Sequence, residues 1–216
     1  MNTHYKKREE ASSERKIVTF PVPHSIDEFK EKIIVYTKSF TDLSKKELIN
    51  RIYKFHSEGN ISEAKKNYQN FIDKGFTDPI VFSNFGILLK NLGNLKEAEI
   101  FERKAIQLNP NFAEAHHILG MILKNLENLK EAEKSIRKAI EINRNYAEAY
   151  NNLVTILIQL SKLEEAEILQ RKAIKINPNS AVSNSNLGKI LLKVGKLEEA
   201  EIILKKAIKL KPNNAS

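Results

Sequence analysis

Apolar residues recur at intervals of three and four along most of the chain, which is the spacing of one face of an α-helix. Short polar or glycine-containing stretches interrupt this pattern at regular distances, so the predicted helices are short and come in pairs. Glycine (7) and proline (6) are scarce among the 216 residues, while helix-forming residues are plentiful. The pattern therefore predicts an all-α chain.

The helix pairs belong to a sequence repeat with a period of 34 residues. Similar segments begin at four evenly spaced residues: NLKEAEIFERKAIQLNPNF at Asn94, NLKEAEKSIRKAIEINRNY at Asn128, KLEEAEILQRKAIKINPNS at Lys162 and KLEEAEIILKKAIKLKPNN at Lys196. With Pro79 counted as position 1 of a unit, the first helix is predicted over about positions 2–15 and the second over about 18–31. Stacked units of this kind bury a continuous core.

Small residues stand where the two helices of a unit must approach each other closely. Position 8 is glycine in three units and position 20 is alanine in all four, as is position 27. Proline follows the second helix in three units, where a residue without an N–H can end it. The residues concerned are Gly86, Gly120 and Gly188; Ala98, Ala132, Ala166 and Ala200; Ala105, Ala139, Ala173 and Ala207; and Pro110, Pro178 and Pro212.

This arrangement resembles the tetratricopeptide repeat, which has Leu-Gly at positions 7–8, alanine at 20 and 27, an aromatic residue at 24 and proline at 32. The resemblance implies a right-handed α-solenoid of helix–turn–helix repeats at 79–112, 113–146, 147–180 and 181–214. Position 24 departs from the family pattern, Arg144 replaces one proline, and Val154 replaces one glycine, which is expected to loosen or shift that helix pair. The residues at position 24 are Glu102, Ile136, Gln170 and Leu204.

The N-terminal part is expected to contain a degenerate fifth repeat and an end cap. Residues 45–78 begin with a possible capping box at Ser44 and Glu47, and Phe71 takes the place of the second alanine. Residues 25–44 predict an amphipathic helix that caps the array, as terminal units of solenoids must. Residues 1–24 are expected to be a disordered or extended leader.

Composition narrows the possible environments and partners. The absence of cysteine excludes disulfides and thiolate sites. No signal peptide and no apolar run of membrane-spanning length is present, which favours a cytoplasmic protein without a membrane partner. The net charge is +9, but most lysines alternate with glutamates, as on solvated helix surfaces. We therefore expect no nucleic-acid partner.

Nothing in the sequence indicates catalysis, a cofactor or a metal. Phosphate-binding, zinc-protease and serine-hydrolase motifs are absent. His116 and His117 are adjacent, so on a helix they diverge by about 100° and do not converge on one ion. His116 occupies position 4, where neighbouring units have Phe82 and Tyr150, so it is expected in the core or at a groove edge. The EEAE runs are interpreted as a solvated convex surface. We expect a protein that is not an enzyme.

The candidate binding site lies on the first helices, whose apolar face uses positions 3, 7, 10, 11 and 14. Positions 2, 6, 9 and 13 form the opposite stripe. The family resemblance implies that this stripe lines a concave groove, and Lys90 and Lys124 at position 12 make the groove mildly basic. An acidic segment or a C-terminal carboxylate would suit it. The remaining peptide-binding candidates are Asn91, Asn125, Gln159 and Lys193 at position 13, and Asn50, Asn84, Asn152 and Asn186 at position 6.

Asparagine occupies position 6 in four of five units, with Ile118 as the exception. A carboxamide offers a donor and an acceptor, so it can bind a peptide backbone without regard to the peptide's side chains. The pattern is similar to the asparagine ladder of the tetratricopeptide superhelix in O-linked N-acetylglucosamine transferases. The alternative is that asparagine is merely tolerated on a wet surface. The neighbouring Asn151, at position 5, has no assigned role.

We therefore expect a non-catalytic scaffold that binds an extended peptide of unidentified sequence in the concave groove. The alternative is the recognition arm of a glycosyltransferase, sulfotransferase or oxygenase system whose catalytic part lies outside this chain. The carboxylate clamp of chaperone-binding tetratricopeptide domains is not present, because position 9 lacks its asparagine. A homodimer through the apolar last helix is also possible, since Ile202, Ile203 and Ile208 would normally be covered by a following helix.

Overall fold

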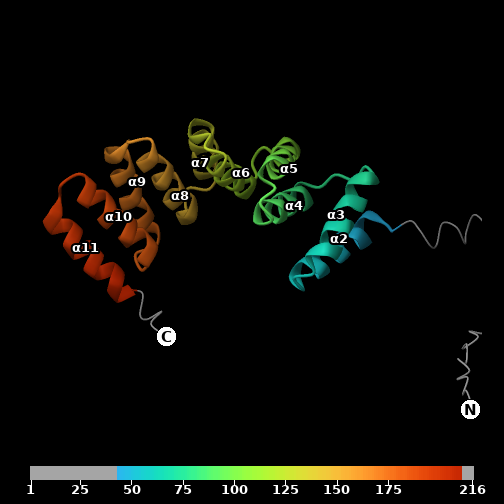
Figure 1. The fold of residues 1–216 in the computed structure, drawn as a ribbon, viewed down its shortest axis with the longest axis horizontal. Helices are drawn as coiled ribbons and strands as arrows, with labels where there is room; N and C mark the ends of the chain where they lie inside the picture. The colour runs from blue at the N-terminus through green and yellow to red at the C-terminus, as the bar shows by residue number, and fades with distance from the viewer. Residues whose placement is uncertain (1–42, 211–216) are drawn as a thin grey trace, which may run out of the picture. The chain divides into compact units, whose positions relative to one another are not determined.

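The computed structural model describes residues 43–210, which form ten α-helices and no strand. The helices are consecutive pairs joined by short turns, so the predicted all-α solenoid of helix–turn–helix repeats is confirmed (Figure 1). The leader at 1–24, the expected capping helix up to residue 42, and Pro212 lie outside the described residues. The pairs are α2 (Lys45–Ser57) with α3 (Ile61–Asp73), α4 (Pro79–Asn91) with α5 (Leu95–Leu108), α6 (Ala113–Asn125) with α7 (Leu129–Ile142), α8 (Ala147–Gln159) with α9 (Leu163–Ile176), and α10 (Ala181–Lys193) with α11 (Leu197–Leu210).

The first helix of each pair ends earlier than predicted because position 15 has left-handed backbone geometry in every pair. Its φ is +69° at Gly59, +81° at Gly93 and +79° at Gly195, where glycine carries no steric penalty. Glu127 and Ser161 occupy the same position in the other two pairs, each with a φ of 60°. A right-handed helix cannot continue through such a residue.

Side chains and prolines mark several helix ends. The Asp78 carboxylate accepts hydrogen bonds from the amides of Ile80 and Val81 at the start of α4, at 3.0 and 3.1 Å. Pro79 is the first residue of that helix, where no N–H is needed. The predicted proline stops are confirmed after α5 and α9, which end two residues before Pro110 and Pro178.

The two helices of a pair pack closely at position 8, where the absence of a side chain makes room for the residue at position 24. A Cβ added at Gly120 would overlap with Ile136 Cγ1, and one added at Gly188 would lie 2.5 Å from Leu204 Cδ2. Val154 replaces this glycine in α8, and α8 and α9 approach each other less closely than the three glycine-containing pairs do. The expected loosening at Val154 is therefore seen.

Within residues 45–210, successive helix pairs stack in an arc, and their first helices lie on its inner side (Figure 1). The first helices α4, α6, α8 and α10 contact one another in sequence, while the second helices of the described pairs have no direct contacts of comparable extent. The apolar core continues across the pair boundaries, from Leu119 in α6 to Ile190 in α10. The first helices thus provide the inner surface of the stack, and the second helices provide its outer surface.

An aromatic cluster joins the degenerate repeat at 45–78 to the next one. Tyr68 of α3 stacks on Phe85 of α4, with ring centroids 4.7 Å apart. Phe71 meets Phe82 edge-on at 6.4 Å and is fully buried. At position 27 the other repeats have alanine, whereas Phe71 packs into the interface between α3 and α4. Aromatic contacts there replace the close helix packing that alanine allows in the other repeats.

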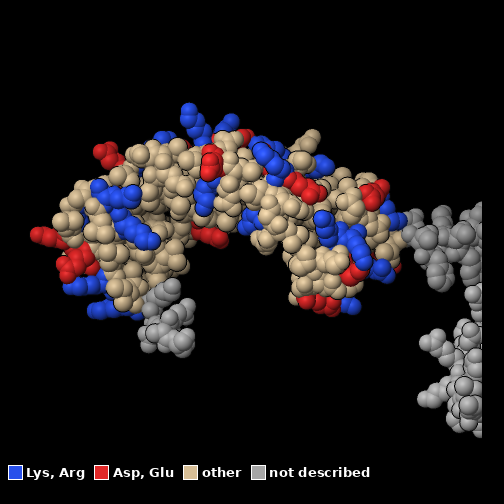
Figure 2. All heavy atoms as spheres, in the orientation of Figure 1, with Lys and Arg blue, Asp and Glu red and all other residues tan. Residues whose placement is uncertain are grey.

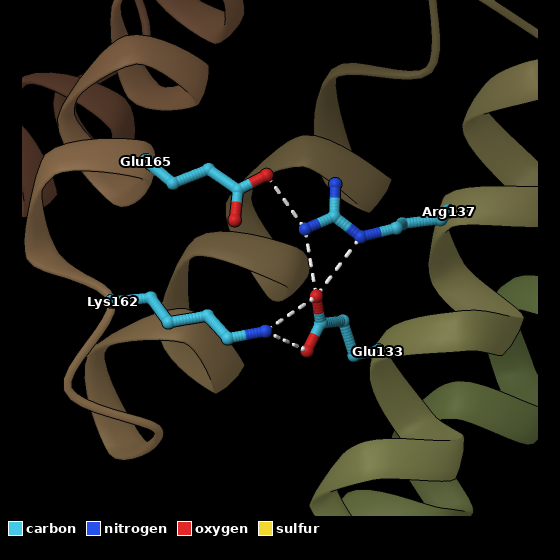
Figure 3. A network of polar contacts seen from close by, with 4 residues as sticks. All are labelled: Glu133, Arg137, Lys162 and Glu165. Carbon is cyan, nitrogen blue, oxygen red and sulfur yellow. Dashed lines mark hydrogen bonds and ion pairs between the residues drawn. The ribbon is translucent and has the colours of Figure 1, made fainter.

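Ion pairs link the second helices of neighbouring repeats on the outer surface. Arg137 of α7 donates to Glu133 on its own helix and to Glu165 on α9, both at 2.7 Å, and Lys162 reaches Glu133 at 2.9 Å (Figure 3). Basic and acidic side chains are interleaved on the face shown in Figure 2. The EEAE runs thus lie on the outer surface, as predicted, but they also bridge repeats. Equivalent contacts join Arg103 to Glu99 and Glu131, Arg171 to Glu167 and Glu199, and Lys196 to Glu167.

The contact at position 8 predicts that Gly120→Ala destabilises the protein. The added methyl group would overlap with Ile136 and lie 3.1 Å from the Ala132 carbonyl oxygen, which belongs to the backbone and cannot rotate away. We expect a loss of about 1–3 kcal/mol, as for other over-packed cores. Gly86→Ala is the matched control, because its methyl group meets the flexible end of Glu102 and should cost less. Thermal unfolding measures both, and a Gly120→Ala protein that melts at or above the wild-type temperature would contradict the packing argument.

Candidate functional site

Each first helix has two stripes of residues. One is buried in the core, and the other is accessible on the inner surface. Val81, Phe85, Leu88 and Leu89, at positions 3, 7, 10 and 11, are each no more than 2% exposed. Position 14 is less buried: Leu92 is 47% exposed, while Leu126, Leu160 and Val194 are half-buried. Leu92 was expected on the apolar face but is the C-cap residue, at the point where the chain turns toward the left-handed residue that follows.

All the predicted groove residues lie on the accessible stripe. Positions 6 and 13 are accessible along the helices from α2 to α10, and Lys90 and Lys124 at position 12 are half-buried. The exposed residues are Asn50, Asn91, Asn125, Gln159 and Lys193; Asn84, Asn152 and Asn186 are half-buried. The structure therefore places the candidates of α4, α6, α8 and α10 on successive helices that contact one another, and Asn50 on the corresponding stripe of α2.

The four asparagines at position 6 differ in their hydrogen bonds. Asn50, Asn84 and Asn186 make no side-chain hydrogen bond to another described residue. Asn152 lies with its Nδ2 2.7 Å from Nε2 of His117, a residue of the preceding repeat. The expected ladder thus contains three free carboxamides and one that is already engaged through its nitrogen.

His117 is the centre of a small polar cluster behind the groove surface. It is 1% exposed, and its Nδ1 lies 3.0 Å from the Tyr146 hydroxyl. Burial lowers the pKa of His117, so the imidazole is neutral near pH 7. With the Asn152 amide donating to Nε2, the proton resides on Nδ1 and is donated to Tyr146. His117 therefore positions Asn152 and is itself closed off from solvent.

His116 has a different environment from its neighbour. Its ring is half-buried, with Nε2 3.0 Å from the carbonyl oxygen of Pro110. The two histidine rings have separate partners, as expected from their divergence on the helix. Within residues 43–210, no cluster of three or more histidine or acidic side chains has the arrangement of a metal site.

Asn151, which had no assigned role, holds three helices together. Its Oδ1 accepts hydrogen bonds from Gln170 Nε2 on α9 at 2.8 Å and from Ser183 Oγ on α10 at 3.1 Å. Gln170 also donates to the Ser183 carbonyl oxygen at 2.9 Å and is fully buried. A signal for this network was present in the sequence, because Gln170 is polar at position 24, where the family has an aromatic residue.

Glu102 is the counterpart of Gln170 in the repeat at 79–112. It is fully buried, and neither carboxylate oxygen has a hydrogen-bond partner. Burial raises the pKa of Glu102 to about 8. The nearby Ser83 hydroxyl and the positive charge of Lys90 lower this pKa, but by less than burial raises it. The carboxyl is therefore protonated at neutral pH and is a neutral group like the carboxamide of Gln170.

Comparison with known proteins agrees with this geometry. A family model of the tetratricopeptide repeat matches residues 81–112, 113–146 and 147–180, and a second model of the repeat matches residues 169–202. The chain belongs to the tetratricopeptide repeat family. No curated protein sequence matches it. No helix within the described part of this tetratricopeptide repeat protein is both long and apolar enough to cross a bilayer.

Several solved tetratricopeptide repeat structures share the fold. MamA from Desulfovibrio magneticus RS-1 is 22% identical, with a TM-score of 0.72 over 80% of this chain and 97% of that one. YrrB, described as a TPR protein with an unusual peptide-binding site, is 22% identical, with a TM-score of 0.69 over 86% and 93%. The pilF protein of Pseudomonas aeruginosa is 18% identical, with a TM-score of 0.69 over 79% and 78%.

The buried carboxyl of Glu102 predicts a pH-dependent stability. In the unfolded chain it ionises near its ordinary pKa of 4.5, whereas in the folded chain it keeps its proton up to about pH 8. The folded state thus binds more protons between these values, and the free energy of unfolding falls as the pH rises through this window. Glu102→Gln should remove this contribution and stabilise the protein at alkaline pH.

Chemical denaturation at about pH 5 and about pH 9 measures the effect, which for a shift of this size is on the order of a few kcal/mol. Gln170→Glu is the matched exchange and should introduce the same pH dependence in the repeat at 147–180. Parallel pH profiles for the wild type and Glu102→Gln would contradict the assignment of a raised pKa.

Proposed function

We propose that this protein is a non-catalytic scaffold that binds an extended peptide segment along the inner surface of its first helices. The observation that carries the proposal is the row of accessible carboxamides at position 6, of which Asn84 and Asn186 have no partner among residues 43–210. A carboxamide can donate to a peptide carbonyl and accept from a peptide amide at the same time. The row therefore suits a peptide backbone in an extended conformation.

Three lysines of the inner surface favour an acidic segment or a C-terminal carboxylate, on a stripe that also carries Glu114 and Glu148 at position 2. Lys90, Lys124 and Lys193 follow the asparagine row at positions 12 and 13, and none of them has an ion-pair partner in the described part of the chain. Cations that are not neutralised within the protein attract anionic ligands and accelerate their association. The fold similarity to YrrB, a protein described as having a peptide-binding site, is consistent with peptide binding here.

Asn152 has a different part in this proposal from the other three asparagines. Its Nδ2 is engaged by His117, so Oδ1 is the atom left to accept a hydrogen bond from a peptide amide. His117 holds the side chain in one orientation and reduces the entropy lost on binding. Asn152 is thus a preorganised acceptor in a row of otherwise free carboxamides.

We predict that Asn152→Ala combined with Asn186→Ala preserves helicity but weakens peptide capture. Two lost hydrogen bonds, each contributing about 0.5–1.5 kcal/mol, correspond to roughly a tenfold loss in affinity or more. Binding is measured on an array of degenerate peptides. Asn111→Ala combined with Asn179→Ala is the matched control, since these are exposed asparagines in the turns before α6 and α10. Equal capture by both double variants would refute the groove assignment.

We also propose that α10 and α11 form a surface for a second copy of the chain. Val182, Leu197, Ile202 and Ile208 are each more than 60% exposed. A hollow of about 560 Å³ lies between the two helices, with Leu204 and Ala207 among its lining residues. Exposed apolar surface of this kind is typical of association sites.

Self-association through this surface predicts a concentration-dependent dimer that Ile208→Glu converts to monomer, because a charge would have to be buried at the contact. Sedimentation or size-exclusion chromatography over a range of protein concentrations measures it. Ile168→Glu is the control, since Ile168 is 60% exposed but lies on α9. A wild-type protein that stays monomeric at high concentration would exclude the dimer.

A further inference from the structure

A second hollow lies on the outer surface, between α5 and α7, and shares no residue with the inner groove. Its volume is about 630 Å³. Ile106, Leu119 and Leu123 form an apolar floor, and Leu119 and Leu123 are no more than 5% exposed. A hollow with an apolar floor and a polar rim is the usual form of a binding site.

The hollow exists because two large residues of the repeat are missing here. The repeats on either side have Phe82 with Phe101 and Tyr150 with Leu169 at positions 4 and 23. The repeat at 113–146 has His116 and Ser135 instead. His116 is turned toward the Pro110 carbonyl, and the Ser135 hydroxyl donates to the His116 carbonyl oxygen at 2.8 Å. Neither side chain fills the space that aromatic and aliphatic groups occupy in the neighbouring repeats.

A cation is introduced at the same place. Positions 22 and 23 are apolar in the repeats at 79–112, 147–180 and 181–214, as Ile100–Phe101, Ile168–Leu169 and Ile202–Ile203, but they are Lys134–Ser135 here. The degenerate repeat at 45–78 also has a polar pair, Lys66–Asn67, but its Lys66 is paired with Glu63. Lys134 lines the hollow, is exposed, and has no ion-pair partner in residues 43–210. Two adjacent substitutions thus create both the space and an unpaired positive charge at its edge.

The other charged groups of the rim are paired within the protein. Besides Lys134, the rim carries Arg103, Arg137, Lys138, Glu131 and Glu141, and Arg137 is paired with Glu133 and Glu165, which lie outside the hollow. Arg103 is paired with Glu131 at 2.6 Å and Lys138 with Glu141 at 2.9 Å, so both carboxylates are neutralised within the protein. An incoming anion would therefore find its partner in Lys134.

The repeat at 79–112 shows what fits such a site. There Phe101 packs against Phe82, with ring centroids 5.9 Å apart, and the Lys104 ammonium lies 5.0 Å from the centroid of the Phe101 ring. Lys138 occupies the position of Lys104 in the repeat at 113–146. An aromatic ring bound in the hollow would lie under a lysine in the same way, which is a favourable cation–π arrangement.

We propose that this outer hollow binds an aromatic side chain presented by an acidic segment of a partner protein. The aromatic group takes the place of the missing Phe101 equivalent, on Leu119 and Leu123, and neighbouring carboxylates of the segment pair with Lys134. The site acts independently of the inner groove, so the scaffold can hold two partners on opposite surfaces.

The test uses the peptide Glu-Glu-Phe-Glu-Glu, titrated into the full chain while the methyl signals of Ile106, Leu119 and Leu123 are followed by NMR. We expect saturable shifts of these signals. Ser135→Phe, which fills the hollow as Phe101 does one repeat earlier, should weaken binding roughly tenfold or more, because the burial of one aromatic ring is lost. Lys134→Glu should weaken it severalfold, and because Lys134 is exposed the change leaves the apolar floor intact.

Three controls decide the interpretation. The peptides Glu-Glu-Ala-Glu-Glu and Lys-Lys-Phe-Lys-Lys should bind much more weakly, and Asn186→Ala should have no effect, which separates this site from the inner groove. Unchanged affinity in both Ser135→Phe and Lys134→Glu would overturn the proposal. So would Ser135-dependent binding of 1-anilinonaphthalene-8-sulfonate without any peptide binding, because the hollow would then be a small-molecule site.

Discussion

The structure depends on the close approach of the two helices of each repeat at position 8. Where this position is glycine, the side chain at position 24 packs directly on the backbone of the first helix, as Ile136 does on Gly120 and Leu204 on Gly188. The buried alanines at positions 20 and 27 are also small, so they too allow the helices to pack closely. Because interiors tolerate little change in volume, this contact fixes how the helices of a pair lie, and the same geometry is then transmitted from pair to pair.

Polar contacts add a second level of order to this packing. The arginine at position 25 bridges its own helix and the next repeat in three successive cases, through Arg103, Arg137 and Arg171. These side chains are more than one third exposed, so each pair contributes little stability by itself. Their regular recurrence instead favours one alignment of neighbouring second helices over others. Buried polar residues at position 24 act differently, since Gln170 ties Asn151 to Ser183 at the centre of three helices.

Most of the fold was predictable because a 34-residue period assigns every residue a position in a known local geometry. The buried and accessible stripes of the first helices, the glycine contacts and the proline stops all follow from that assignment. Interactions between repeats were less accessible to sequence reasoning. The bond from Asn152 to His117 joins residues that are 35 apart, in different repeats and at different positions. No periodic pattern contains it, and the same holds for Asn151 with Ser183. Leu92 is more exposed than its position predicts because it is the C-cap residue of α4.

The departures from the repeat carry more functional information than the repeat itself. The unit at 113–146 differs from its neighbours on both surfaces. On the inner surface, Ile118 interrupts the asparagine row and His117 orients Asn152. On the outer surface, Lys134 and Ser135 replace an apolar pair and leave a charged hollow. Packing alone would be served by the residues found in the other units, since Phe101 and Leu169 fill the equivalent space with no polar cost. Lys134 and Ser135 give up buried apolar surface, which costs stability. Residues that are kept against that cost are what the proposed binding site on the outer surface would require.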